Sequence, residues 1–147
     1  MITDPGALQD VRDSWEFVRE SRNVIVGNCN VATFVVGFNQ QGIRDICFNL
    51  LFASAISVLE DVLRQLRDEG KFTCKDNRLG PLMASSRTSL LWNDYSFIDK
   101  ARDERNRSIH DRTYLPHADC RKFIAAIESE FVAWGVLTSA ASQLWHW

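Results

Sequence analysis

The stretch from Ile43 to Glu69, IRDICFNLLFASAISVLEDVLRQLRDE, decides the fold class. Its apolar residues recur every three or four positions, which is typical of a helix with one buried face. The residues of the predicted face are Ile43, Ile46, Cys47, Leu50, Leu51, Ser54, Val58, Leu59, Val62, Leu63 and Leu66. Gly70 is a natural stop for this helix. At the rise of an α-helix, the stretch spans about 40 Å.

A second amphipathic helix is predicted before this stretch, from Ala7 to about Arg22. Asp4 can cap its start, with Pro5 at the first helical position. The following segment, 24–36, is rich in β-branched residues and fits either a helix or a short hairpin. Because its flanks are strongly helical, we expect a helix with a break near Gly27.

Two further helices are predicted after Gly70. Pro81 can open a third helix that continues through Leu91. Asn93 and Asp94 supply caps for a fourth helix, from Tyr95 to about His110.

A last helix is predicted from His117 towards Trp145. The segment Thr113–Pro116 separates it from the fourth helix, because proline disfavours the helical conformation in the residue before it. Its predicted buried face comprises Cys120, Phe123, Ile124, Ile127, Phe131, Trp134, Thr138, Ala141 and Leu144.

These elements predict an all-α fold, a single up-down bundle of four to five helices that occupies residues 1–147 as one domain. The composition agrees, since 147 residues with 46% hydrophobic and 24% charged side chains are ordinary for a globular domain. This composition excludes intrinsic disorder. The net charge of −2 provides no overall positive field that would attract nucleic acid.

The cysteines and the termini indicate a cytoplasmic protein with no membrane partner. The four cysteines form no C-x-x-C pair, and Cys47 and Cys120 lie on apolar helical stripes, so we expect reduced structural thiols. The N-terminus lacks the basic and apolar segments of a signal peptide. The uncharged stretches 23–43 and 131–147 are too polar or too short for a transmembrane helix.

The usual catalytic motifs are absent from the sequence. There is no G-x-G-x-x-G, Walker A loop, H-E-x-x-H or G-x-S-x-G. The histidines at 110, 117 and 146 are not spaced as metal ligands, so neither a metal nor another cofactor is expected.

The fourth predicted helix carries the one unusual pattern. On a helical wheel, Arg105 lies about 20° from Ile98, inside the stripe that Ile98, Ala101 and Ile109 define. A guanidinium on an inward face is costly unless it is paired or opens onto a cleft. His110 falls where this helix is predicted to end.

The segment Arg105–His110 resembles the Arg-Asn-x-x-x-His motif of the HEPN superfamily. HEPN domains are small all-α bundles, commonly metal-independent endoribonucleases, and many are toxins in toxin–antitoxin or phage-defence systems. The resemblance implies that Arg105 and His110 are catalytic and that Asn106 supports them. One HEPN variant has a tyrosine two residues after the histidine, but Arg112 occupies that place here and Tyr114 comes two residues late.

The resemblance also implies partners and a reaction. Two chains would form a homodimer in which two motifs share one RNA-cleaving cleft, and an antitoxin or another regulatory protein would restrain it. Histidine can act as base or acid near neutral pH, and arginine binds phosphate oxygens. The expected product carries a 2′,3′-cyclic phosphate end.

Other residues of the fourth helix are open to two interpretations. Glu104 either orients Arg105 or His110, or is a surface acid. Arg102, Arg107 and Arg112 either contact RNA phosphates or form surface salt bridges.

Three hypotheses therefore remain for the whole chain. The first is a HEPN-type endoribonuclease, and the second is a non-catalytic HEPN-like module that binds protein or RNA. The third is an unrelated bundle, in which Arg105 pairs with an acid on a neighbouring helix and His110 caps a helix end.

Overall fold

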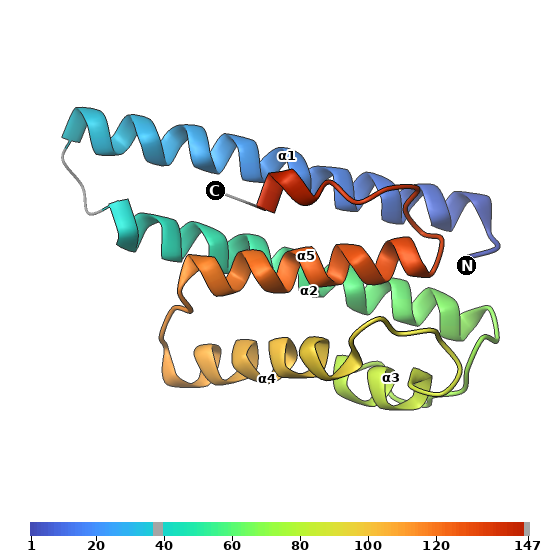
Figure 1. Cartoon of the computed structure of the whole chain (residues 1–147). Coiled ribbons are helices and arrows are strands. Elements are labelled where there is room, and N and C mark those ends of the chain that lie inside the picture. Colours follow the sequence, from blue (N-terminus) through green and yellow to red (C-terminus); the bar gives the residue numbers. More distant parts are fainter. Residues whose placement is uncertain (37–39, 146–147) are drawn as a thin grey trace.

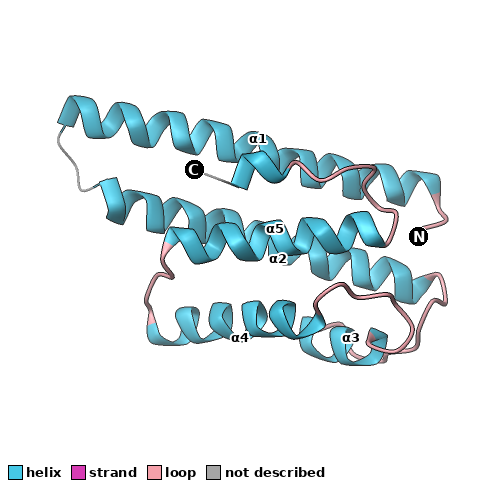
Figure 2. Cartoon of the chain, viewed as in Figure 1, coloured by secondary structure: helices cyan, strands magenta, loops and turns pink. Residues whose placement is uncertain are grey.

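The computed structural model describes residues 1–36 and 40–145, with the side chains of 29–36, 40–41 and 142–143 left undescribed. Within these ranges the chain is all-helical and contains no strand, as predicted (Figure 2). The helices are α1 (Pro5–Val36), α2 (Gln40–Asp68), α3 (Leu79–Ser86), α4 (Tyr95–Asp111) and α5 (His117–Ala133), followed by the 3₁₀ turn η1 (Ser142–Trp145).

The helix α2 lies at the centre of the bundle (Figure 1). It packs against α1 on one side, against α5 along much of its length, and against the short α3. The helix α4 packs on α5 and α3, so it lies on the side of the bundle away from α1. The functional helix predicted from the sequence is thus an outer element with one face towards the core.

Pairs of aromatic side chains pack α1 and α2 against α5. Trp15 of α1 meets Phe131 of α5 edge to face, with ring centroids 5.0 Å apart. Phe52 of α2 stacks on Phe123 of α5 at 5.4 Å. Such pairs add stability beyond the apolar area that they bury.

The buried face of α2 differs from the predicted one at its first turns. The side chains of Phe48, Phe52 and Ala55 are fully buried, whereas Leu50 is 63% and Ile46 41% exposed. The predicted stripe includes Leu50 and Ile46 because helical spacing alone does not say which side the neighbouring helices cover. Two large apolar side chains are therefore left at the surface near the start of α2.

Several predicted helix ends are confirmed. The Asp4 carboxylate accepts a hydrogen bond from the Ala7 N–H at 3.0 Å, at the start of α1. The Asp94 carboxylate accepts one from the Phe97 N–H at 3.0 Å, at the start of α4. Gly70 follows α2 with a φ of +77°, which glycine adopts without strain.

The expected break near Gly27 is wrong, and so is the alternative hairpin. A single continuous helix runs from Pro5 to Val36. Gly27 is exposed, and a glycine inside a helix costs only about 1 kcal/mol, which the packing of so long a helix on α2 can offset.

The last helix is shorter than predicted, because it ends at Ala133 rather than near Trp145. Gly135 has a φ of +68° and opens a turn in which the Val136 N–H bonds the Phe131 carbonyl at 2.8 Å. This is a helix-ending motif that glycine favours. Trp145 still reaches the core, at 3% exposure, through the separate turn η1.

The third helix is also shorter than predicted. It begins at Leu79 and ends at Ser86, so the expected continuation through Leu91 is wrong, and Leu91 is 77% exposed. The Ser-Ser-Arg-Thr-Ser segment at 85–89 consists of weak helix formers, which accounts for the early end.

By length and composition alone, the segment Gly42–Asp68 of α2 is also apolar enough to cross a membrane. Half of its most apolar window is buried inside the bundle. A core helix passes the same test, so this feature is weak support for a membrane.

Candidate functional site

The Arg105–His110 motif occupies the last two turns of α4. The helix ends where Arg112 adopts a left-handed conformation, with a φ of 53°, and its N–H bonds the carbonyls of Ser108 and Ile109. The Ser108 hydroxyl donates to the Thr113 carbonyl and ties down the chain after the helix. The predicted position of His110 at the end of the helix is confirmed.

Arg105 lies on the inward side of α4, next to a fully buried stripe. Ala101 and Ile98, one and two turns earlier, are both 0% exposed. The Nε atom of Arg105 is itself buried and has no hydrogen-bond partner. No acid within the described residues forms an ion pair with it. The third hypothesis expects such a pair, and the described residues do not provide one.

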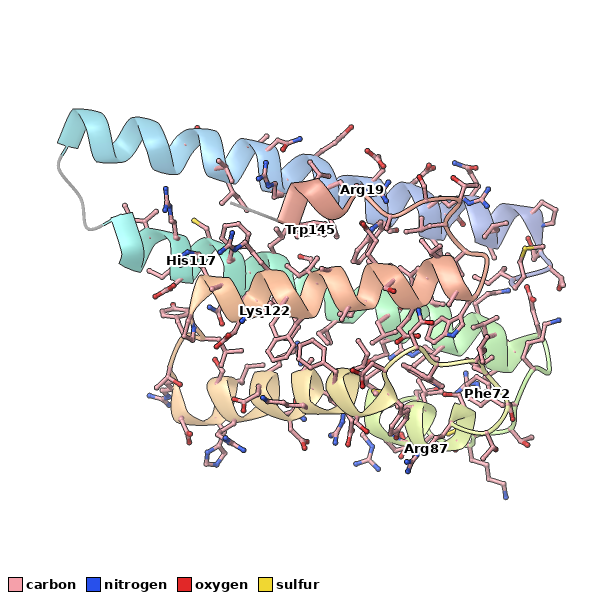
Figure 3. The ribbon with its side chains drawn as sticks, in the orientation of Figure 1. Arg19, Phe72, Arg87, His117, Lys122 and Trp145 are labelled. Carbon is pink, nitrogen blue, oxygen red and sulfur yellow. The ribbon has the colours of Figure 1, made fainter. Side chains whose placement is uncertain are left out.

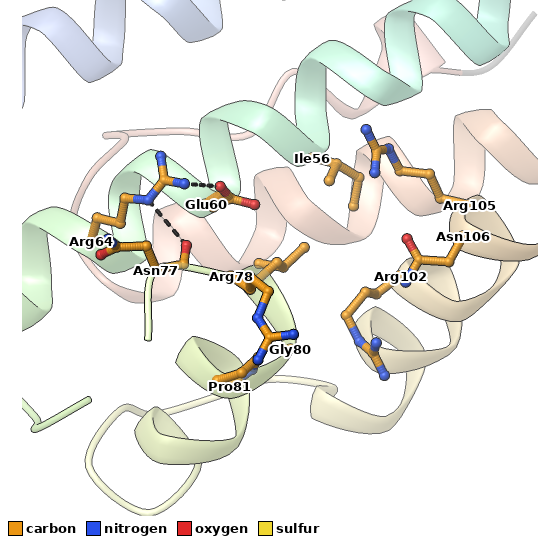
Figure 4. Close-up of a pocket in the computed structure, with 11 residues that line it drawn as sticks. Ile56, Glu60, Arg64, Asn77, Arg78, Gly80, Pro81, Arg102, Arg105 and Asn106 are labelled. Atoms are coloured by element: carbon orange, nitrogen blue, oxygen red, sulfur yellow. Dashed lines mark hydrogen bonds and ion pairs between the residues drawn. The ribbon is translucent and has the colours of Figure 1, made fainter. Parts of the chain in front are cut away.

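Two cavities meet at Arg105. The first, which we call the arginine pocket, has a volume of about 490 Å³ and lies between α2, the start of α3 and α4 (Figure 4). Its charged lining residues are Glu60, Arg64, Arg78, Arg102 and Arg105. The second cavity has a volume of about 290 Å³, between α2 and the end of α4, and Leu50, Ile109 and Tyr114 are among its lining residues.

His110 points away from both cavities. Its side chain is 90% exposed, and its Nδ1 atom lies 3.2 Å from the Asp111 carboxylate. Residues five apart on a helix project about 140° from each other, which explains why it diverges from Arg105. Within one chain, therefore, the two predicted catalytic side chains do not share a pocket.

The two predicted supporting residues lie in different places. Asn106 is exposed and lines the arginine pocket beside Arg105. Glu104 lies 3.6 Å from the Arg107 guanidinium and lines a different cavity, one that faces the start of α5. Within the described residues, Glu104 thus pairs with Arg107 rather than with Arg105 or His110.

The three predicted RNA-binding arginines are also separated. Arg102 lines the arginine pocket and is held by Asp99 at 2.9 Å and Asp103 at 2.8 Å. Arg112 lines the second cavity at the end of α4. Arg107 is 67% exposed and lines neither of them.

Part of the arginine pocket is missing from the sequence-based prediction. Arg64 comes from α2, Arg78 is the residue before α3, and Gly80 lies in the first turn of α3. The Arg78 guanidinium beside Asp76 lowers the pKa of that carboxyl to about 2. Basic residues 64 and 78 are unremarkable in the sequence, because only the fold brings them opposite α4.

An exposed apolar surface adjoins Arg105, and we call it the α2–α4 patch. It consists of Ile46, Leu50, Ile109 and Tyr114, which are between 41% and 63% exposed. Leu50, Ile109 and Tyr114 line the same cavity as Arg105, and Ile46 is one helical turn before Leu50. Ile109 lies on the same face of α4 as the buried Ile98 and Ala101, but it is 61% exposed, so this apolar face reaches the surface at the end of the helix.

The remaining titratable groups of the motif's neighbourhood are structural. His117 is buried at the start of α5, and both its N–H and its ring bind the Asp45 carboxylate, at 2.7 and 3.0 Å. Burial raises the pKa of the Cys120 thiol to about 12, so this thiol is no nucleophile near neutral pH. Among the residues that the structure describes, no three His, Cys, Asp or Glu side chains come together as a metal site.

Comparison of the chain with family models, with curated proteins and with solved structures gives no match.

Proposed function

We propose that the protein is an endoribonuclease that cleaves RNA at a composite site formed by two copies of the chain. The observation that carries this proposal is Arg105, whose buried Nε atom has no acceptor in the described part of the chain while its guanidinium borders two cavities. A buried donor without a partner is costly, and a guanidinium is the side chain best suited to grip phosphate oxygens. A phosphate ligand would give this arginine the hydrogen-bond acceptor that it lacks among the described residues.

The α2–α4 patch supports the dimer. Large apolar side chains at 41–63% exposure, around an arginine with no ion pair in the described part of the chain, are unfavourable in water, and a second copy on a two-fold axis would cover them. Such an isologous contact places the partner's motif against this one. His110 is 90% exposed and outside both cavities of its own chain, so in this arrangement the His110 of the second copy would complete the site beside Arg105.

The chemistry follows from these residue types. A neutral histidine accepts the proton of the ribose 2′-hydroxyl, and the 2′-oxygen attacks the adjacent phosphorus. The bond from phosphorus to the 5′-oxygen breaks, and a protonated histidine supplies the proton that this oxygen takes up. Arg105 stabilises the charge that develops on the phosphate oxygens. The products are a 2′,3′-cyclic phosphate and a 5′-hydroxyl, and no metal ion enters this scheme.

The resemblance of Arg105–His110 to the HEPN motif is consistent with this proposal, and with a toxin or phage-defence effector of the cytoplasm that is restrained by an antitoxin or another regulatory protein.

The test is cleavage of total RNA in EDTA by the wild-type protein, Arg105→Ala and His110→Ala. Lys100→Ala is the matched control, because it removes one exposed positive charge from the same helix and lines neither cavity at Arg105. We expect cyclic-phosphate ends from the wild type and the control, and intact RNA from the other two variants. Identical RNA patterns from all four proteins would refute the enzymatic proposal.

A second candidate function is a non-catalytic module that binds RNA or protein through the same face. The separation of His110 from Arg105 within one chain favours it. Retained RNA binding without cleavage, under conditions in which the protein is dimeric, would support this alternative.

A further inference from the structure

The arginine pocket is lined mainly by basic side chains, and some of their N–H donors have no acceptor within the described residues. Four arginines and one glutamate carry its charge, so the lining has a positive balance although the whole chain has a net charge of −2. Figure 4 shows Arg102, Arg105 and Asn106 of α4 opposite Arg78, which precedes α3, and Gly80 in the first turn of α3. These cations differ in how many of their donors are already occupied.

Each of the three side-chain nitrogens of Arg64 already contacts a residue of its own chain. Its Nη2 and Nη1 atoms pair with Glu60 and Asp61, and its Nε–H donates to the Asn77 carbonyl at 3.2 Å. An arginine with all three nitrogens engaged is a wall of the pocket rather than a ligand-binding group.

Arg102, by contrast, keeps one nitrogen free. Its Nε and Nη2 atoms bind Asp99, and Nη2 also lies 2.8 Å from Asp103. The Nη1 atom has no acceptor among the described residues and faces Gly80, where a Cβ atom would lie 3.4 Å from it. The two acids thus fix the guanidinium and leave its Nη1 edge open towards the start of α3.

The start of α3 offers donors at the same place. Arg78 is its N-cap residue and provides no side-chain cap. Within the described residues, the N–H groups of Leu79 and Gly80 have no acceptor, and Pro81 has no N–H. The Arg78 guanidinium binds Asp76 through Nε and Nη2, so its Nη1 atom is also unused.

We propose that the arginine pocket binds the phosphate of the RNA nucleotide next to the one whose linkage is cut. The assignment of the ligand to RNA rests on the proposed function. The phosphate lies between Arg102 Nη1 and the first turn of α3, where fixed donors and the helix dipole both favour an anion. Arg105, which borders this pocket and the second cavity, contacts the scissile phosphate.

The size of the pocket selects a nucleotide over a bare ion. At about 490 Å³ it falls within the range of about 300–1,000 Å³ typical of small-molecule sites. Asn77 and Asn106 also line it; the Asn77 Oδ1 atom already accepts a hydrogen bond from Arg67 at 2.7 Å, and the Asn106 amide can bond the edge of a base. A strand held in this way has one phosphate fixed beside the bond to be broken, which positions the substrate.

Binding of adenosine 3′-monophosphate, adenosine and inorganic phosphate to the full chain tests this inference without any cleavage. The arginine Nε–H resonances in NMR spectra report the contact, and calorimetry reports the affinity. Arg102→Ala removes the proposed ligand. Gly80→Leu leaves the charge unchanged but fills the space beside Arg102, and its Cβ fits because nothing lies closer than 3.4 Å. Arg107→Ala is the control, since it removes a charge outside the pocket.

We expect adenosine 3′-monophosphate to bind more tightly than either adenosine or phosphate alone. Arg102→Ala and Gly80→Leu should each weaken it about tenfold or more, and Arg107→Ala less than about twofold. An undiminished affinity in Gly80→Leu, an equal loss in Arg107→Ala, or no binding of the nucleotide by the wild type would overturn the inference.

The two proposals fail separately. RNA cleavage without binding of the mononucleotide would refute only the proposed role of the arginine pocket. Binding without cleavage would refute the endoribonuclease proposal and leave the nucleotide site standing.

Discussion

Two arginines on inward helix faces have opposite surroundings in this molecule. Arg19 of α1 lies beside the C-terminal turn (Figure 3). Its three nitrogens bind Glu128 at 3.0 Å, Glu16 at 3.3 Å and the Ser139 carbonyl at 3.0 Å. Arg105 of α4 has no such acceptor within the described residues, although its Nε atom is buried.

The difference between the two arginines distinguishes a charge that stabilises the fold from one that we propose to bind a ligand. Around Glu128, which is 1% exposed, the Trp15 indole, the Arg19 guanidinium and the Ala141 N–H all converge, so the charges satisfy one another. The fold pairs the buried charge of Arg19 with acceptors, so stability accounts for it. Arg105 carries a desolvation cost and has no ion pair within the described residues. We therefore attribute Arg105 to an external anion.

The largest effect on stability is expected at Glu128. Glu128→Ala leaves the Arg19 charge and the Trp15 N–H without their acceptor, so the free energy of unfolding should fall by about 3–5 kcal/mol. Urea denaturation followed by tryptophan fluorescence measures this. A loss below about 1 kcal/mol would erase the contrast between the two regions.

The next effect concerns the dimer. Leu50→Glu places a charge in the α2–α4 patch, where Leu50 is 63% exposed in the single chain, so the fold should persist while dimer affinity falls about thirtyfold or more. Light scattering across protein concentrations gives the affinity. Leu91→Glu, at another exposed leucine outside the patch, is the control. Equal behaviour of the two variants would contradict the proposed interface.

A smaller effect is expected at Glu69, which tethers the N-terminus. Its carboxylate accepts the N–H groups of Asp4 and Thr3, and hydrogen bonds from the Asp4 backbone and other donors lower its pKa to about 2. A lowered carboxyl pKa gives stability that is present above the ordinary value near 4.5 and is lost as the pH falls towards 2.

Glu69→Gln should cost about 1 kcal/mol or less at pH 7, because solvent screens this surface site. The difference from the wild type should shrink between pH 4.5 and 2, as acid denaturation curves can show. A constant difference across that range would contradict the role of the ionised carboxylate.

The smallest effect on stability is expected at Arg105 itself. Arg105→Met keeps the apolar stem and removes a charge that has no ion pair within the described residues, so the free energy of unfolding should change by less than about 0.5 kcal/mol or rise. Thermal unfolding of this variant beside Arg19→Met checks it. If Arg105→Met destabilises as much as Arg19→Met, Arg105 has a structural role.

The sequence predicts the helices well where capping and periodicity act together. Asp94 and Gly70 mark real helix ends, and the stretch 43–69 is a central helix. The end of α5 is missed although Gly135 signals it, because the apolar spacing continues past Ala133. Periodicity also fails to show that Leu50 is exposed, since exposure depends on how α2 is covered by its neighbours.

The candidate site is predicted only in part for the same reason. The position of Arg105 on the inward face of α4 follows from the wheel, but the arginine pocket needs residues from α2 and α3 that no local pattern connects. The divergence of His110 from Arg105 is implicit in their spacing of five, and its consequence for a composite site becomes clear only with the exposed patch in view.

The measurement that tests the central claim most directly is the RNA cleavage rate of Arg105→Ala per folded molecule, beside its unfolding midpoint. We predict a rate at least about a hundredfold below that of the wild type, with the midpoint unchanged. An undiminished rate in a folded, dimeric Arg105→Ala protein would contradict the assignment of Arg105 to the phosphate.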